Sequence, residues 1–94
     1  MSIDTSKFTD EYWKFVAAAI RASAAHAAQM KERGINDIPN KVYYKEIQNQ
    51  FGDRRRADEL TSEFQAAGWI SHGNSMFCQL SNEFVALAEA TATK

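Results

Sequence analysis

Five basic residues gather in one short stretch of this 94-residue chain. Between positions 41 and 56 lie Lys41, Lys45, Arg54, Arg55 and Arg56 with only two acidic residues, a local charge of +3 in a chain whose net charge is −1. Clustered lysine and arginine side chains bind phosphate, and arginine also donates paired hydrogen bonds to the edge of a guanine. The placement of charge, rather than its total, therefore indicates a candidate nucleic-acid interface.

Residue types that catalyse reactions or bind metals are sparse. The two histidines, His26 and His72, have no ligand-like spacing with the single cysteine, Cys78. The sequence also has no glycine-rich phosphate loop and no paired nucleophile and base. His26 is more simply a surface or interface residue, and Cys78 a small buried side chain. We therefore expect a protein that is not an enzyme, with no metal site and no cofactor.

Length and composition narrow the class of protein. A chain of 94 residues with 45% hydrophobic and 24% charged residues is typical of one globular domain. It has no apolar run long enough to span a membrane, and its first residues lack the basic flank and apolar stretch of a secretory signal. One cysteine cannot form an internal disulfide, which favours a reducing, cytoplasmic location.

A long helix is predicted over residues 8–34. Thr9 is a good N-cap, and Phe8 with Trp13 occupy the positions of a hydrophobic staple. Apolar and small residues then recur with a helical period, and Gly34 supplies a left-handed end.

Two shorter helices are predicted next, over residues 41–51 and 54–67. Asn40 is expected to cap the first, whose buried side holds Val42, one of the adjacent tyrosines, Ile47 and Phe51. Gly52 and Asp53 separate the two helices, so the segment 40–68 is a helix-turn-helix candidate.

A β-hairpin is predicted over residues 69–80. Gly73 and Asn74 suit a two-residue type II′ turn, which would place Ile70 opposite Phe77. The other face of the hairpin would then present Met76, Cys78 and Leu80. The pattern leaves open which face is buried.

The chain is expected to end in a short helix over residues 81–90, capped by Ser81. Residues 1–7 and 91–94 are expected to be flexible. The predicted fold is thus a single domain, residues 1–94, that is mainly α with a small β-hairpin.

This order of elements resembles the winged helix-turn-helix superfamily. The likeness is carried by Leu60–Ile70 (LTSEFQAAGWI), by the hairpin after it and by Gln79-Leu80-Ser81, and it covers about residues 40–82. The resemblance implies a third helix that enters the major groove of DNA and a hairpin that forms the wing. The superfamily also includes modules that bind proteins instead of DNA.

Helix-turn-helix geometry assigns roles to the basic residues. Lys41 and Lys45, four residues apart on the second helix, would hold phosphate, and one arginine of the third helix would reach a base edge. Arg55 is the favoured base reader because it shares a helical stripe with Ser62. The predicted DNA contacts are Lys41, Lys45, Arg54, Arg55, Arg56, Ser62 and His72.

Acidic residues weigh against strong DNA binding. The third helix also contains Asp58, Glu59 and Glu63, and Glu59 is placed to pair with Arg55. The turn of the wing offers no lysine or arginine, only His72. The basic cluster is alternatively a solvated surface without a ligand. If it does bind DNA, we expect weak binding by one copy of the chain and therefore a dimer.

The alanine-rich middle of the first helix suggests where two copies meet. Small side chains let another helix approach closely, so Ala19, Ala22 and, in the last helix, Leu87 are the predicted dimer contacts. The alternative is a helix of high propensity that packs on its own core.

Taken together, the sequence predicts a small dimeric DNA-binding protein, a transcriptional regulator that uses its third helix in the major groove. The competing hypothesis is a winged-helix protein-interaction module without DNA binding, either an adaptor subunit or a phage-type inhibitor of a host complex.

Overall fold

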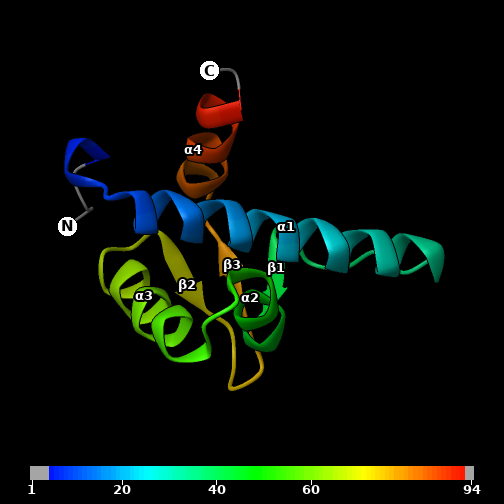
Figure 1. Ribbon diagram of the computed structural model, residues 1–94. Coiled ribbons are helices and arrows are strands. Elements are labelled where there is room, and N and C mark those ends of the chain that lie inside the picture. The colour runs from blue at the N-terminus through cyan, green and yellow to red at the C-terminus, as the bar shows by residue number, and fades with distance from the viewer. Residues whose placement is uncertain (1–4, 93–94) are drawn as a thin grey trace.

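One long helix organises the molecule, with the other elements on its two sides (Figure 1). The computed structural model describes residues 5–92. The helices are η1 (Thr5–Lys7, a 3-10 turn), α1 (Asp10–Glu32), α2 (Tyr44–Phe51), α3 (Arg54–Ala66) and α4 (Asn82–Ala92). The strands are β1 (Lys41–Tyr43), β2 (Ile70–His72) and β3 (Phe77–Leu80). The α2 and α3 helices and the sheet lie on one side of α1, and α4 lies on the other.

The coarse fold prediction is confirmed. The described residues form four α-helices and a three-stranded antiparallel sheet of order β1-β3-β2. None of the helices between residues 5 and 92 is long and apolar enough to cross a membrane. Of the ends expected to be flexible, residues 1–4 and 93–94 lie outside the described part of the chain.

The predicted signals at the two ends of α1 are confirmed. The Thr9 side chain accepts a hydrogen bond from the backbone N–H of Tyr12 at 3.2 Å, and the rings of Phe8 and Trp13 are 4.9 Å apart. After the C-cap residue Arg33, Gly34 adopts a left-handed φ of 68°. Local sequence alone therefore defines this helix.

Four phenylalanines from the four helices meet in the middle of the core. The Phe15 and Phe64 rings stack with centroids 5.1 Å apart, and Phe84 packs edge-on against Phe64 at 5.5 Å. Phe51 lies 6.1 Å from Phe15. Each aromatic pair adds about 0.5–1.5 kcal/mol to the free energy of burial, so this cluster fixes how the helices face one another.

Ala19 and Ala22 of α1 face this core, so the prediction that they are dimer contacts is wrong, while the contact predicted for Leu87 stays a prediction. Ala19 and Ala22 are fully buried within their own chain, with no surface left for a second copy. Leu87 is half-buried and packs against the same core. The small side chains serve close packing inside the molecule, while Ala24 on the opposite face of α1 is exposed.

The first three residues of the predicted second helix form a strand instead. In β1, Val42 is fully buried and pairs with Cys78 of β3. Asn40 is not an N-cap: it has a left-handed φ of 61°, and its carbonyl accepts a hydrogen bond from Leu80 N at 2.9 Å. Pairing with a strand nearly forty residues away overrides local helix propensity. The α2 helix consequently begins at Tyr44.

The turn between α2 and α3 agrees with the prediction. Gly52 takes a left-handed φ of 91° and ends α2, a conformation that side-chain-bearing residues rarely adopt. The Asp53 carboxylate accepts a hydrogen bond from the Arg56 N–H at 3.1 Å and so caps α3. At the far end of the chain, the Ser81 hydroxyl caps α4 by accepting from Phe84 N at 3.1 Å, as predicted.

The hairpin is wider than predicted. Ile70 pairs with Leu80 and not with Phe77, so residues 73–76, here called the hairpin tip, connect the strands. Gly73 does not have the positive φ that a type II′ turn needs. The Asn74 carboxamide closes the turn by accepting from Met76 N at 2.7 Å. Cys78 and Leu80 face the core, whereas Met76 is exposed.

The burial of Ala19 gives a direct test of this fold. Ala19→Glu places a charge in the closed core and should destabilise the protein by about 3 kcal/mol or more. Ala24→Glu adds the same group on the exposed face and should change the free energy of unfolding by less than about 0.5 kcal/mol. Urea denaturation followed by circular dichroism measures both. Equal stability of the two variants would contradict this placement of α1.

Candidate nucleic-acid interface

The exposed face of α3 carries Arg55 and Ser62. The opposite face buries Ala57, Leu60, Thr61 and Phe64. Because seven residues make nearly two helical turns, Arg55 and Ser62 lie on one stripe, as predicted. Arg55 has no ion pair with another residue of the described range 5–92. The stripe is therefore open to a partner.

Arg56 does not belong to this open stripe. Its guanidinium donates two hydrogen bonds to the Glu11 carboxylate of α1, one of them 3.0 Å long, and another to Glu59 at 3.2 Å. These bonds, Glu11 first, raise the pKa of the Arg56 guanidinium, and the same contact lowers the pKa of Glu11. Arg56 thus joins α3 to α1 and is not the free phosphate contact that the sequence predicted.

Each acidic residue of α3 that opposed DNA binding has a partner within the protein. Glu59 pairs with Arg56, so the predicted pair between Glu59 and Arg55 is wrong. Glu63 accepts a hydrogen bond from the Tyr12 hydroxyl at 2.8 Å, which is the main cause of the raised pKa of Tyr12. Asp58 accepts from Gln48 at 2.7 Å. These bonds leave Arg55 unpaired.

Lys41 also has a structural role. It lies in β1, so it does not share a helix face with Lys45. Its ammonium group is 3.2 Å from the Asp37 carboxylate and lies 4.2 Å from the centre of the Phe77 ring. Its side chain is 13% exposed. Lys41 is therefore a poor candidate for a phosphate contact.

Asp37 connects three segments of the chain. Besides Lys41, its carboxylate contacts His26 Nε2 of α1 at 2.9 Å and accepts from Ile38 N at 2.7 Å. The hydrogen bond with His26 is the largest cause that lowers the pKa of Asp37 to about 2. His26 is buried and serves this network, which makes it neither the surface residue nor the interface residue that the sequence suggested.

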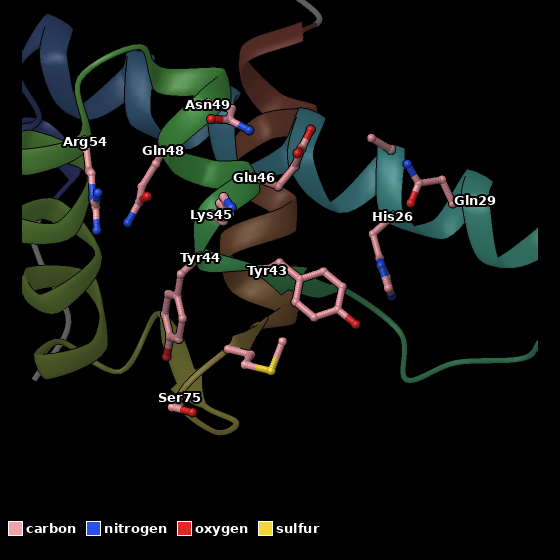
Figure 2. A pocket seen from close by; sticks show the side chains of 12 residues that line it. His26, Gln29, Tyr43, Tyr44, Lys45, Glu46, Gln48, Asn49, Arg54 and Ser75 are labelled. Carbon is pink, nitrogen blue, oxygen red and sulfur yellow. The ribbon is translucent and has the colours of Figure 1, made fainter.

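The remaining cations, Lys45 of α2 and Arg54 of α3, are exposed and line a groove of about 710 Å³ (Figure 2). The groove lies between α1, the outer side of α2 and the hairpin tip. Tyr43, Tyr44 and Met76 also line it, and sequence reasoning missed all three. The available signal was the pair of adjacent tyrosines, of which the predicted helix could place only one on its buried side.

The hairpin contributes little charge. His72 lies exposed in β2, and the described hairpin has no lysine or arginine. The tip instead presents Met76, whose side chain is 65% exposed. Any contact of the hairpin with a polyanion would therefore come from His72, from uncharged side chains or from the backbone.

The described residues contain neither an exposed thiol nor a metal-binding cluster. Cys78 is buried in β3, and burial raises the pKa of its thiol to about 12, which makes it unreactive. Among residues 5–92, no three His, Cys, Asp or Glu side chains are grouped so that they could hold a metal ion.

No family model, curated protein or solved structure matches this chain. The function proposed below therefore rests on the geometry of the described residues.

The Asp37 network predicts a dependence of stability on pH. The folded pKa of about 2 lies below the ordinary value of 3.8, so the network stabilises the fold above pH 4 and loses this contribution as the pH falls toward 2. Asp37→Asn should flatten the loss of stability between pH 5 and pH 2, as measured by urea midpoints. Asp10→Asn, at an exposed carboxylate, is the control. An unchanged profile in Asp37→Asn would contradict the network.

Proposed function

We propose that this chain is a winged helix-turn-helix protein that binds duplex DNA with α3 in the major groove. The element order α1-β1-α2-α3-β2-β3 and the sheet order β1-β3-β2 support this assignment, since they supply a helix pair followed by a hairpin. In such a motif the second helix of the pair meets base edges with its first residues. Here those residues include Arg54 and Arg55.

The observation that carries the proposal is the position of Arg55. It stands in the first turn of α3, exposed, unpaired within the described chain and aligned with Ser62. Arginine in this position can donate two hydrogen bonds to guanine O6 and N7. Arg54, the preceding residue of α3, and the exposed Lys45 of α2 are assigned to phosphate. A transcriptional regulator is the kind of protein that uses such a site.

Few cations support the interface, and this favours a dimer. With Lys45 and Arg54 as the phosphate contacts of one protomer, the logarithm of the binding constant should fall with a slope of about −2 against the logarithm of salt concentration. A symmetric dimer on an inverted repeat doubles the number of contacts. Its interface would have to use surfaces other than Ala19 and Ala22, which are fully buried.

The second candidate is a protein-interaction module of the same architecture. The ion pairs of Lys41 and Arg56 favour it, because they remove two of the five clustered cations from any phosphate surface. The exposed Met76 at the hairpin tip favours it as well, since methionine is common at protein-binding surfaces. A module of this kind would not bind duplex DNA at moderate salt.

Two substitutions separate base reading from phosphate contact. Arg55→Ala should cost about 1–3 kcal/mol on the preferred site and relax the preference at one base pair. Lys45→Ala should weaken binding to all sequences alike and flatten the salt slope by about one unit. Fluorescence anisotropy with a selected site and a random duplex measures both effects.

Lys31→Ala, on the exposed end of α1, is the control for loss of charge. All three variants should keep the melting temperature of the parent protein, because the residues are exposed. Full DNA affinity in Arg55→Ala would exclude α3 as the reading helix. Absence of binding by the parent protein would favour the protein-interaction module.

The dimer is tested separately. Multi-angle light scattering at micromolar concentration should give twice the 10.6 kDa mass of one chain or, once a duplex containing an inverted repeat is added, the mass of the duplex plus two chains. A single-chain mass for the free protein together with one chain per duplex in the mixture would show that the protein binds single half-sites.

A further inference from the structure

The groove between α1, α2 and the hairpin tip has the size of a small-molecule site. Its volume of about 710 Å³ lies within the range of about 300–1,000 Å³ that is typical of ligand pockets. In Figure 2, Arg54 and Gln48 stand on one side, His26 and Gln29 on the other, and Tyr43 and Tyr44 lie between them. Segments from four different parts of the chain thus converge on this hollow.

Two aromatic rings, each held by a contact within the protein, give the groove apolar surface. The His26 ring packs edge-on against Tyr43 with centroids 4.9 Å apart, and the Tyr44 hydroxyl accepts a hydrogen bond from Gln65 at 2.9 Å. The Met76 thioether lies beside them. Aromatic rings and sulfur attract other aromatic rings, so this surface suits a planar aromatic group.

The charge on the groove favours an anion. Lys45 and Arg54 line it, and neither has an ion pair within residues 5–92. Glu46 is the carboxylate of the lining, and it accepts a hydrogen bond from Gln50 at 3.4 Å. The two unpaired cations therefore outnumber the one carboxylate, and an anionic group complements them.

We propose that this groove binds a small planar aromatic anion. Its ring lies against Tyr43, Tyr44 and Met76, and its carboxylate or phosphate pairs with Arg54 and Lys45. The site stands whether or not the protein binds DNA, because it depends only on the described groove. Volume and charge together favour this ligand over a peptide, which would need a longer surface.

One consequence rests on the proposed function. Lys45 and Arg54 are assigned there to DNA phosphate, so the aromatic anion and DNA would compete for the same two cations. Occupation of the groove should then weaken DNA binding, in the manner of an effector ligand.

The probes are 2-naphthoate and 2-naphthyl phosphate, with uncharged 2-naphthylmethanol as the reference. Protein labelled with carbon-13 at the methionine methyl groups is titrated by NMR. The Met76 signal, assigned with Met76→Leu, should shift and saturate with at least one of the anions. Met30 lines a different hollow, of about 420 Å³, and its signal should stay in place. The neutral alcohol should bind about two- to fivefold more weakly, because it lacks the exposed charge pairs.

Three variants test which side chains bind the anionic group of the ligand. Arg54→Gln and Lys45→Gln should each weaken binding of the preferred anion about two- to fivefold, whereas Arg55→Gln, next to Arg54 but outside the groove, should not. A Met76 signal that fails to move, equal affinity for the alcohol, or equal shifts at Met30 would overturn the proposal. If the Met76 signal shifts but the anion does not displace bound duplex, the anion binds in the groove but does not compete with DNA. If the parent protein binds no duplex, the proposed function is wrong, but the methyl titration still shows whether the groove binds the aromatic anion.

Discussion

The stacking of Phe64 on Phe15 sets the direction in which α3 faces. Phe64 is fully buried and lies nine positions after Arg55 in the same helix. At about 100° per residue this is about two and a half turns, so the two side chains point to opposite faces of α3. Burying the phenylalanine therefore turns the arginine outward. The edge-on contacts of Phe84 with both rings add α4 to the same cluster. The candidate interface is thus a geometric consequence of the core, since any rotation of α3 that hid Arg55 would expose Phe64.

Polar contacts around α3 reinforce this orientation. Tyr12 and Glu11 of α1 engage Glu63 and Arg56, while Gln48 of α2 engages Asp58. Exposed pairs of this kind contribute about 0–1 kcal/mol each, so they refine the position of α3 and do not determine it. They also decide which groups pair. Asp58, Glu59 and Glu63 are bonded to residues other than Arg55, although Asp58 and Glu63, whose partners are uncharged, keep their negative charge on α3.

The sequence was sufficient wherever the deciding signal is local. Thr9, Gly34, Gly52 and Ser81 mark the ends of helices through hydrogen bonds or backbone conformations that involve only their near neighbours. The strand β1 could not be predicted in this way. Three residues show no periodicity, and their conformation is decided by pairing with β3 and by the burial of Val42. The same long-range pairing fixes the hairpin register, which the turn residues alone predicted wrongly.

The five basic residues that are close together in the sequence do not form one surface in the folded molecule. The five cations between residues 41 and 56 separate into three groups: Lys41 and Arg56 hold the fold together, Lys45 and Arg54 line the groove, and Arg55 faces outward on α3. Because counterion release scales with the number of phosphates neutralised, the few open cations of this stretch would give one protomer only a small electrostatic contribution to DNA binding. The two parts of the proposed function are linked for this reason: a second copy on an inverted repeat would double the number of contacts.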